Sequence, residues 1–549
     1  MTEQNTQAKQ WRGPDPWSVM ALVIAGVVVA PIVAVLWLAL HPTENIWPHL
    51  LATVLPRYLR NTLVLMAGVG AVTATVGTGA AWLVVMHRFP GSRWLEHALL
   101  APMAIPAYIG AYALVDFLDY AGPLQSGMRL AAGWKSSKDY WFPEVHSMGF
   151  AILVLAAAYY PYVYLLARAA FREMSGSTYE VAQALGTGRW GRFWRVGLPL
   201  ARPAIAAGVA LALMETVADV GTVQHFAVQT LTTGVYSVWF NGNNAGGAAQ
   251  LSGVILALIL TLLAVERQAR NQARFHRPSR SARPVMPVDL HGVRAWAAAV
   301  CCGLPFTFGF VLPVAVMSDH ALRKPQVWLM PGLGAAILNT LIVGGLAAVV
   351  TVTAALVLVH GVRLGGRSLA RVVLPVTALG YAAPGAVLAV GILIPLAALD
   401  HRLADAVLAV TGHDPGLLLT GTAAALVLAY AVRFFGIAQS AVDSAFGRVS
   451  PMLPLAARSL GRTAGGVLRD VFLPLMRGSV STALLVVFVE CSKELPATLL
   501  LRPFNFNTLA TRAYDLASLE KITEAAPAAL LVIAVGLMAV AVLARTSRA

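Results

Sequence analysis

Ser177 to Ile205 reads STYEVAQALGTGRWGRFWRVGLPLARPAI, and Pro454 to Val480 reads PLAARSLGRTAGGVLRDVFLPLMRGSV. In both stretches a short run ends at Leu-Gly, an arginine-bearing run follows, and a Leu-Pro pair leads into an apolar segment. Glycine and proline are 13 residues apart in each copy (199 − 186 and 474 − 461). Glycine ends helices in the left-handed conformation, and proline is tolerated in a first helical turn. We therefore predict helix, bend and helix in each copy.

The composition is that of a membrane protein. Of the 549 residues, 58% are hydrophobic and 12% charged, and the mean hydropathy is +0.70. Several uncharged apolar runs reach the roughly 20 residues that a helix needs to cross about 30 Å of hydrocarbon. A membrane barrel would instead show roughly ten-residue alternating segments. The sequence predicts an all-α polytopic membrane protein.

Twelve transmembrane helices are expected, six in each half. Most of the 40 Lys and Arg residues then lie in cytoplasmic segments if both termini are cytoplasmic, which favours that topology in a bacterial inner membrane. The first apolar run is too long for a signal-peptide core and is expected to remain as a span. The expected spans lie near residues 17–40, 61–86, 97–118, 148–171, 204–226, 250–265, 293–317, 336–360, 372–398, 418–439, 478–500 and 527–544.

The two halves repeat beyond the opening stretches. Asn61-Thr62-Leu63 recurs as Asn339-Thr340-Leu341, and Pro106 matches Pro384, both 278 residues apart. The halves are expected to share one orientation and to face each other across the pathway, because an even number of spans separates them. The expected domains are a first half at 1–265 with its element at 177–203, a basic linker at 266–292, and a second half at 293–549 with its element at 454–477.

The excess of positive charge, +15, is interpreted as topology rather than as a nucleic-acid site. The arginine-rich linker is compatible with a polyanion, but a cytoplasmic linker near anionic lipid is the favoured interpretation. The three cysteines, Cys301, Cys302 and Cys491, have no metal-site spacing. No tight metal site and no bound cofactor are expected.

The repeated element resembles the coupling motif of bacterial ABC importer permeases, which runs Glu-Ala-Ala, then Gly, then a distant Leu-Pro. Leu455 stands in the second copy where the first has Glu180, so the second element is expected to dock with one charged contact fewer. An interfacial amphipathic helix pair is the structural alternative. The matching residues are Glu180, Ala182, Gly186, Leu198 and Pro199 in the first copy, and Ala456, Ala457, Gly461, Leu473 and Pro474 in the second.

This resemblance implies that each element docks into an ATP-hydrolysing subunit, so that two copies of that subunit serve the chain. No Gly-Lys dipeptide occurs, so the chain has no phosphate-binding Walker loop of its own. We expect a transport subunit rather than an enzyme, with ATP hydrolysed by a partner.

Within these permeases the chain looks like the ferric-iron subgroup, which implies Fe³⁺ delivered by a periplasmic binding protein. Permeases for thiamine, phosphonate and other small solutes share much of this pattern and remain alternatives, as does a gradient-driven secondary transporter. The stretches that carry the resemblance are ETVADVGTVQ at 215–224, TLTTGVY at 230–236, KELPAT at 493–498, NTLATRAY at 507–514 and the aromatic run YYPYVY at 159–164.

Four acidic residues are expected inside the membrane. Glu215 and Asp219 are four apart, and Glu490 and Glu494 repeat the pair 275 residues later (490 − 215), so each pair is expected on one face of its helix. A carboxylate at bilayer depth costs about 2.5 kcal/mol or more and therefore faces a partner or an aqueous cavity. Hard Fe³⁺ prefers oxygen ligands, and transport needs release, so the hypothesis is a pathway lining without tight binding.

Purely structural roles for the four carboxylates are equally open. Lys493 is a candidate partner for the second pair, and Thr216, Gln224 and His225 are candidates for the first. The longest expected external loop, Asp119 to Ser147, is a candidate surface for the binding protein or an interfacial aromatic anchor.

Overall fold

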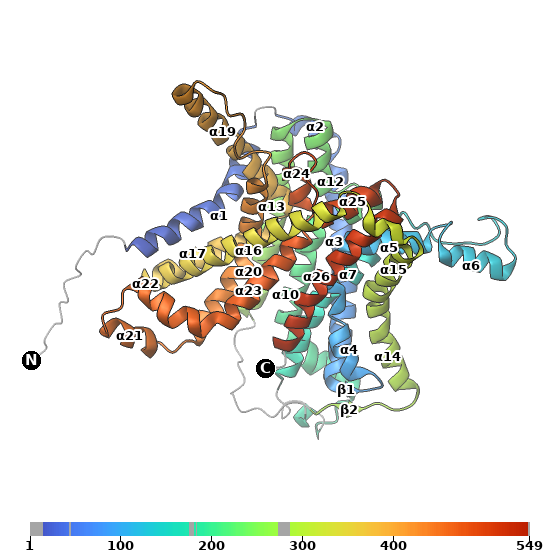
Figure 1. Cartoon of the computed structure of the whole chain (residues 1–549). Helices are drawn as coiled ribbons and strands as arrows, with labels where there is room; N and C mark the ends of the chain where they lie inside the picture. The colour runs from blue at the N-terminus through green and yellow to red at the C-terminus, as the bar shows by residue number, and fades with distance from the viewer. Residues whose placement is uncertain (1–14, 43–44, 175–179, 183, 273–285, 547–549) are drawn as a thin grey trace, which may run out of the picture.

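The computed structural model describes residues 15–42, 45–174, 180–182, 184–272 and 286–546, and the account below is of those residues. Figure 1 shows long helices packed side by side, with short helices between them. The one strand pair in the described ranges is β1 (His87–Arg88) with β2 (Val288–Asp289), which run parallel. The pair ties the segment before the second half to the end of a first-half helix.

The helices of the first half are α1 (Pro16–Leu40), α2 (Trp47–Ala52), α3 (Leu55–Met86), α4 (Ser92–Ala98), α5 (Ala107–Leu118), α6 (Pro123–Ala132), α7 (Met148–Arg172), α9 (Arg189–Arg192), α10 (Leu198–Ala218), α11 (Gly221–His225), α12 (Leu231–Tyr236) and α13 (Ala245–Gln272). Those of the second half are α14 (Val293–Phe306), α15 (Leu312–Arg323), α16 (Leu333–Leu364), α17 (Arg367–Thr377), α18 (Leu379–Ala382), α19 (Gly385–Thr411), α20 (Ala423–Arg448), α21 (Met452–Ser459), α22 (Ala464–Val467), α23 (Leu473–Ser492), α24 (Pro496–Leu501), α25 (Leu509–Ser518) and α26 (Ile522–Thr546).

The prediction of about twelve spans in two tandem halves is confirmed. Eleven helices within the described residues are long and apolar enough to cross a membrane, and a pair bent by 98° makes a twelfth. That pair replaces the straight span expected at 97–118. The chain breaks before Pro106, and the second half breaks equivalently before Pro384, because the residue before a proline disfavours the helical conformation.

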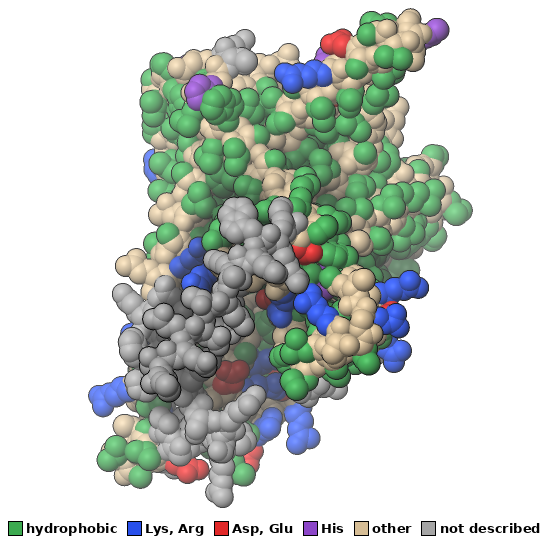
Figure 2. Space-filling model, turned by 90° about the vertical axis from the view of Figure 1, so that its left-hand side faces the viewer, with side chains coloured by type: hydrophobic (Ala, Val, Ile, Leu, Met, Phe, Trp, Pro, Cys, Tyr) green, Lys and Arg blue, Asp and Glu red, His purple; other side chains and the backbone are tan. Residues whose placement is uncertain are grey.

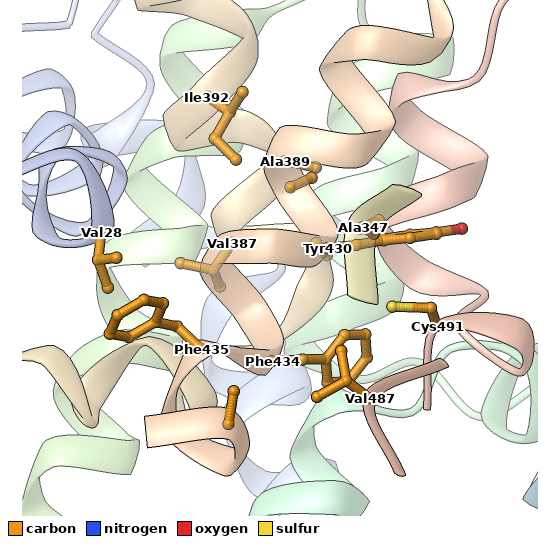
Figure 3. Packing of buried hydrophobic residues seen from close by; sticks show 14 of the residues in the cluster. Val28, Ala347, Val387, Ala389, Ile392, Tyr430, Phe434, Phe435, Val487 and Cys491 are labelled. Carbon is orange, nitrogen blue, oxygen red and sulfur yellow. The ribbon is translucent and has the colours of Figure 1, made fainter. Parts of the chain in front are cut away.

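The first helix of each half packs on the other half. Val28 of α1 lies in the same core cluster as Val387 and Phe435 of the second half, as Figure 3 shows. Two glycines allow the close approach: a Cβ at Gly361 or Gly391 would collide with the backbone of α1. In return, α15 packs against α5 of the first half. The first helix of each half therefore forms part of the contact between the halves.

One end of the molecule is strongly basic. Figure 2 shows Lys and Arg side chains gathered below a broad hydrophobic surface, towards the end where α21 lies. We call this the coupling end, because both repeated elements lie there. The ring of Trp17, at the start of α1, is 5.0 Å from that of His360, and His360 contacts the carbonyl of Ala464 in the second element at 3.1 Å. The beginning of α1 therefore lies at the coupling end.

The expected external loop projects from the bundle as α6 and the turns that follow it (Figure 1). Trp134 stacks on Tyr140 at 4.9 Å between ring centroids, while Trp141 is exposed. The backbone N–H groups of Ser136 and Lys135 bond the carboxylate of Asp139 and lower its pKa. The loop is ordered by its own contacts, and its role in receiving a binding protein stays a prediction.

Candidate functional site

Both repeated elements bend at the predicted glycine. Gly186 has φ of +79° and Gly461 φ of +83°, in the left-handed region that strains other residues. The leucine before each glycine is exposed, Leu185 to 78% and Leu460 to 84%. An apolar side chain held out at the charged end of a membrane protein, on a rigid bend, is typical of a docking surface.

The structure places the predicted coupling residues on these elements without testing their docking. Glu180 is exposed and Ala182 is buried, whereas Leu455 is exposed at the position equivalent to Glu180. Ala456 is exposed and Ala457 half-buried. Residues 177–179 of the first element, and 273–285 of the predicted basic linker, lie outside the described residues.

Each Leu-Pro pair lies inside a continuous helix rather than at its start. A π-helical turn, Phe193–Gly197, precedes Leu198, and Leu468–Phe472 precedes Leu473. The wider turn accommodates the proline ring, which would otherwise clash with the carbonyl four residues earlier. The membrane-crossing helices therefore run from 190 to 218 and from 464 to 492. The spans expected at 204–226 and 478–500 were placed too far along the chain.

Side chains of complementary size pack against each π-helical turn, and the large and small positions differ between the two halves. A Cβ at Gly197 would lie 2.5 Å from the Trp82 ring, which packs against Phe193 at 5.1 Å between centroids. The equivalent positions in the second half hold His360 and Phe472 (360 − 82 = 278; 472 − 197 = 275), with centroids 6.0 Å apart. The first half thus pairs a large ring with glycine, and the second pairs a smaller ring with phenylalanine. Each π-helical turn is thus packed against an aromatic ring of its own half.

The prediction that each acidic pair shares one helical face is wrong. α10 ends at Ala218, and Asp219 has extended backbone with ψ of 134°. α23 ends at Ser492, so that Glu494 also lies beyond its helix. Glu215 is 17 residues beyond Leu198 (215 − 198), about 25 Å along the helix at 1.5 Å per residue. The carboxylates therefore lie far from the coupling end. They lie at or just beyond the opposite ends of α10 and α23.

The second acid of each pair caps a short helix. Asp219 accepts hydrogen bonds from the N–H of Thr222 at 2.9 Å, the Thr222 hydroxyl at 3.0 Å and the N–H of Val223 at 3.2 Å, at the start of α11. Glu494 accepts the N–H of Ala497 at 2.9 Å, at the start of α24. The structural role considered for these residues is thus present in both halves.

The partners expected for the first pair were wrong. Thr216 bonds the carbonyl of Ala212 in its own helix, Gln224 accepts a bond from Tyr514, and Nε2 of His225 is without a hydrogen-bond partner within the described ranges. Asp219 is satisfied by Thr222 instead. Neither acid of the first pair takes part in an ion pair in the part of the chain that the structure describes.

The second pair is held by two bases. Lys493 lies 2.8 Å from Glu490, as expected, and Nζ also approaches the carbonyl of Met103 at 3.4 Å. Arg433 of α20 lies 3.1 Å from Glu494. Arg433 is a functional candidate that the sequence interpretation missed. Its signal was available, since Arg433 is the single charged residue in the span expected at 418–439.

The four carboxylates line one cavity of about 100 Å³ between the halves. The lining repeats with the internal symmetry, because residues 275 apart face the same space (490 − 215, 494 − 219 and 434 − 159). Tyr108 and Tyr162 add phenol groups. Across the described residues, no three His, Cys, Asp or Glu side chains are arranged to hold a metal ion. The cavity is polar and is lined from both halves.

A larger cavity of about 850 Å³ lies between the halves beyond the carboxylates, on the side away from the coupling end. We call it the vestibule. It too is lined from both halves, with Tyr236 and Tyr514 at equivalent positions (514 − 236 = 278). The two cavities thus both lie between the halves, each lined by residues of the first and of the second half.

Residues 73–272 match the family described as binding-protein-dependent transport system inner membrane component. The chain is 25% identical over 491 residues to the Fe(3+)-transport system permease protein FbpB 2 of Haemophilus influenzae, covering 86% of this chain and 87% of that relative.

Other relatives match about one half. The molybdenum transport system permease protein ModB of Escherichia coli is 29% identical over 35% of this chain and 82% of its own length. The sulfate transport system permease protein CysT of the same species is 26% identical over 33% of this chain and 65% of its own length. A solved bacterial alginate ABC transporter chain is 17% identical, with a TM-score of 0.37, covering 47% of this chain and 94% of its own.

Two tandem halves, eleven or twelve spanning helices within the described residues and a relative that matches across both halves agree with one another. The chain has the layout of a fused permease subunit and is similar to the permease components of binding-protein-dependent transport systems.

Proposed function

We propose that this permease imports ferric ion, delivered by a periplasmic binding protein and driven by ATP that separate subunits hydrolyse. The observation that carries the proposal is the match to a ferric permease along both halves, over 86% of the chain. The relatives named for molybdenum and sulfate transport match only about a third of it.

The cavity chemistry supports a hard cation. Carboxylates and phenols are oxygen groups, which hard metal ions prefer, and four carboxylates meet at one passage. Tyr159 and Tyr162 line the same space. A cavity of about 100 Å³, whose side chains form no metal-binding cluster within the described residues, favours passage over storage.

The coupling end supports docking of two ATPase copies in the cytoplasm. It carries two bends with exposed leucines, and the basic side chains gather there, as they do on cytoplasmic faces. The start of α1 lies at this end, and Val540 of α26 packs into the cluster around Trp82, near the same end. These positions support our proposal that both termini are cytoplasmic and that the vestibule faces the binding protein.

The test is uptake of radiolabelled ferric iron by cells that express this chain with its ATPase and binding protein. A catalytically dead ATPase is the control for energy coupling. Accumulation that requires ATP hydrolysis, and that excess Ga³⁺ suppresses while sulfate, molybdate and thiamine do not, is the expected result. A complex that assembles but accumulates no iron would overturn the substrate assignment.

A further inference from the structure

The charges of the cavity are asymmetric, although its carboxylates are not. Each half supplies two acids, but only the second supplies bases. The first half has Ala158 where the second has Arg433, and Ala218 where it has Lys493 (433 − 158 and 493 − 218 are both 275). All four of these positions line the cavity. The asymmetry leaves one acidic pair balanced by charge and the other open.

The position of Arg433 depends on a glycine in another helix. A Cβ at Gly385, the first residue of α19, would collide with the carboxylate of Glu494 and the guanidinium of Arg433. In the first half the residue after the equivalent proline is Ala107, and no arginine is present there. Glycine at 385 thus provides the room that the ion pair needs.

Arg433 is not fully satisfied in this position. Its side chain is almost entirely buried, at 7% exposed, and Nε lies 3.1 Å from Glu494. Nevertheless neither Nε nor Nη1 makes a hydrogen bond in the described part of the chain, and neither does the hydroxyl of Tyr108, which lines the same cavity. A buried guanidinium with unused donors is held less firmly than a complete bidentate pair. The ion pair between Arg433 and Glu494 is therefore suited to displacement of the guanidinium by another cation.

We propose that Arg433 is a specificity-determining residue that acts as a resident counter-cation. It occupies Glu494 until a hard cation displaces it, and it returns to Glu494 as that cation leaves. Glu215, which takes part in no ion pair within the described residues, receives the cation first. The identity of the cation as ferric ion rests on the proposed function; the exchange itself does not.

The physical reason is the balance between attraction and release. Four carboxylates around a largely buried cavity would hold a trivalent ion strongly, since charge interactions grow as the effective dielectric constant falls. A guanidinium and an ammonium among them oppose that binding and prevent the ion from being trapped. Arg433 thereby lowers the affinity of the cavity for the cation and increases the rate at which the cation is released.

Binding of Tb³⁺, a luminescent hard trivalent ion, to the purified full-length permease tests this directly. R433Q is expected to bind Tb³⁺ about tenfold more tightly or better, since a tenfold change corresponds to a repulsion of only ~1.4 kcal/mol. E494Q is expected to bind about tenfold more weakly, because the freed guanidinium turns to Glu215. A merely structural ion pair would weaken binding in both variants.

Two controls keep the test sharp. R433K retains the charge and should bind like the wild type. R363Q breaks a partly exposed pair, Arg363 with Asp443 at 2.7 Å, far from the cavity lining, and should also leave Tb³⁺ binding unchanged. If R433Q folds poorly, the double variant R433Q/E494Q removes both charges, and it should bind more tightly than E494Q alone.

Folded R433Q that binds Tb³⁺ no better than the wild type, or a double variant no tighter than E494Q, would overturn the proposal. Iron uptake by the wild type separates this outcome from failure of the proposed function. If the wild type imports no iron while R433Q tightens Tb³⁺ binding, the exchange stands and the ferric assignment falls. If the wild type imports iron and R433Q does not tighten binding, the exchange falls alone.

Discussion

The hydroxyl of Tyr514 in the second half donates a hydrogen bond to Oε1 of Gln224 in the first half, over 2.7 Å. The equivalent tyrosine of the first half, Tyr236, donates to the carbonyl of Pro496 in the second. Both acceptors lie on the short helices that follow the carboxylates, α11 and α24. The boundary between vestibule and acidic cavity is thus formed by two reciprocal bonds between the halves.

Removing the Tyr514 hydroxyl should loosen this boundary. Y514F loses a hydrogen bond worth about 0.5–1.5 kcal/mol, so the population with a widened vestibule should rise roughly two- to tenfold. Spin labels at Phe240 and Phe504, exposed residues on opposite rims, report the width by their distance distribution. Y140F, whose hydroxyl bonds Gln125 within one loop, should leave the distribution unchanged. An unchanged distance distribution in Y514F would show that the Tyr514 hydrogen bond does not hold the two halves together at this boundary.

The size exchange at the π-turns predicts a compensating pair. G197F should lower the free energy of unfolding by about 1–3 kcal/mol, because the new side chain collides with the Trp82 ring. Adding W82H reproduces the combination of the second half and should restore most of the loss. Thermal stability of the purified permease measures both changes. Equal stability of G197F and the double variant would show that the two positions are not coupled.

The bend at Gly461 should be sensitive to any side chain. G461D places a non-glycine residue at φ of +83° and adds charge beside the exposed Leu460, so less ATPase should remain bound to the affinity-tagged permease. G447A is the matched control, since a Cβ there meets nothing within 4 Å and the backbone is helical. Normal ATPase retention and normal transport in G461D would count against the docking role.

Substitutions of Asp219 should distinguish its role as the cap of α11 from the effect of its negative charge on cation uptake. D219A removes the cap of α11 and should cost about 0.5–2 kcal/mol of stability, whereas D219N retains an oxygen acceptor and should cost less. If the carboxylate also attracts the cation, uptake of iron should fall in both variants. Full uptake by a stable D219N would restrict Asp219 to its capping role.

The sequence patterns that succeeded are those set by local chemistry. Gly186 and Gly461 predicted the bends because left-handed backbone favours glycine, and apolar runs predicted the number of spans because the bilayer sets their length. The equal spacing of the acidic pairs predicted that the halves would present them together, and the shared cavity agrees.

The predictions that failed depend on specific side-chain contacts, one local and one across the fold, which helical periodicity does not report. Whether a helix ends at Ala218 or continues past Asp219 is decided by the cap that Asp219 gives to α11, which a period of 3.6 does not report. Arg433 and Glu494 are 61 residues apart (494 − 433) and meet only because α19, α20 and the end of α23 converge. The spacing of the acids held, but their shared helical face did not.

The most direct measurement of the central claim is the initial rate of radiolabelled iron uptake by the double variant E215Q/E490Q, assembled with its ATPase and binding protein. The exchange of Glu for Gln keeps size and removes charge from both halves of the cavity. The account predicts that uptake falls at least about tenfold, equivalent to ~1.4 kcal/mol, while assembly and ATP hydrolysis persist. Uptake at the wild-type rate would contradict a carboxylate-lined pathway.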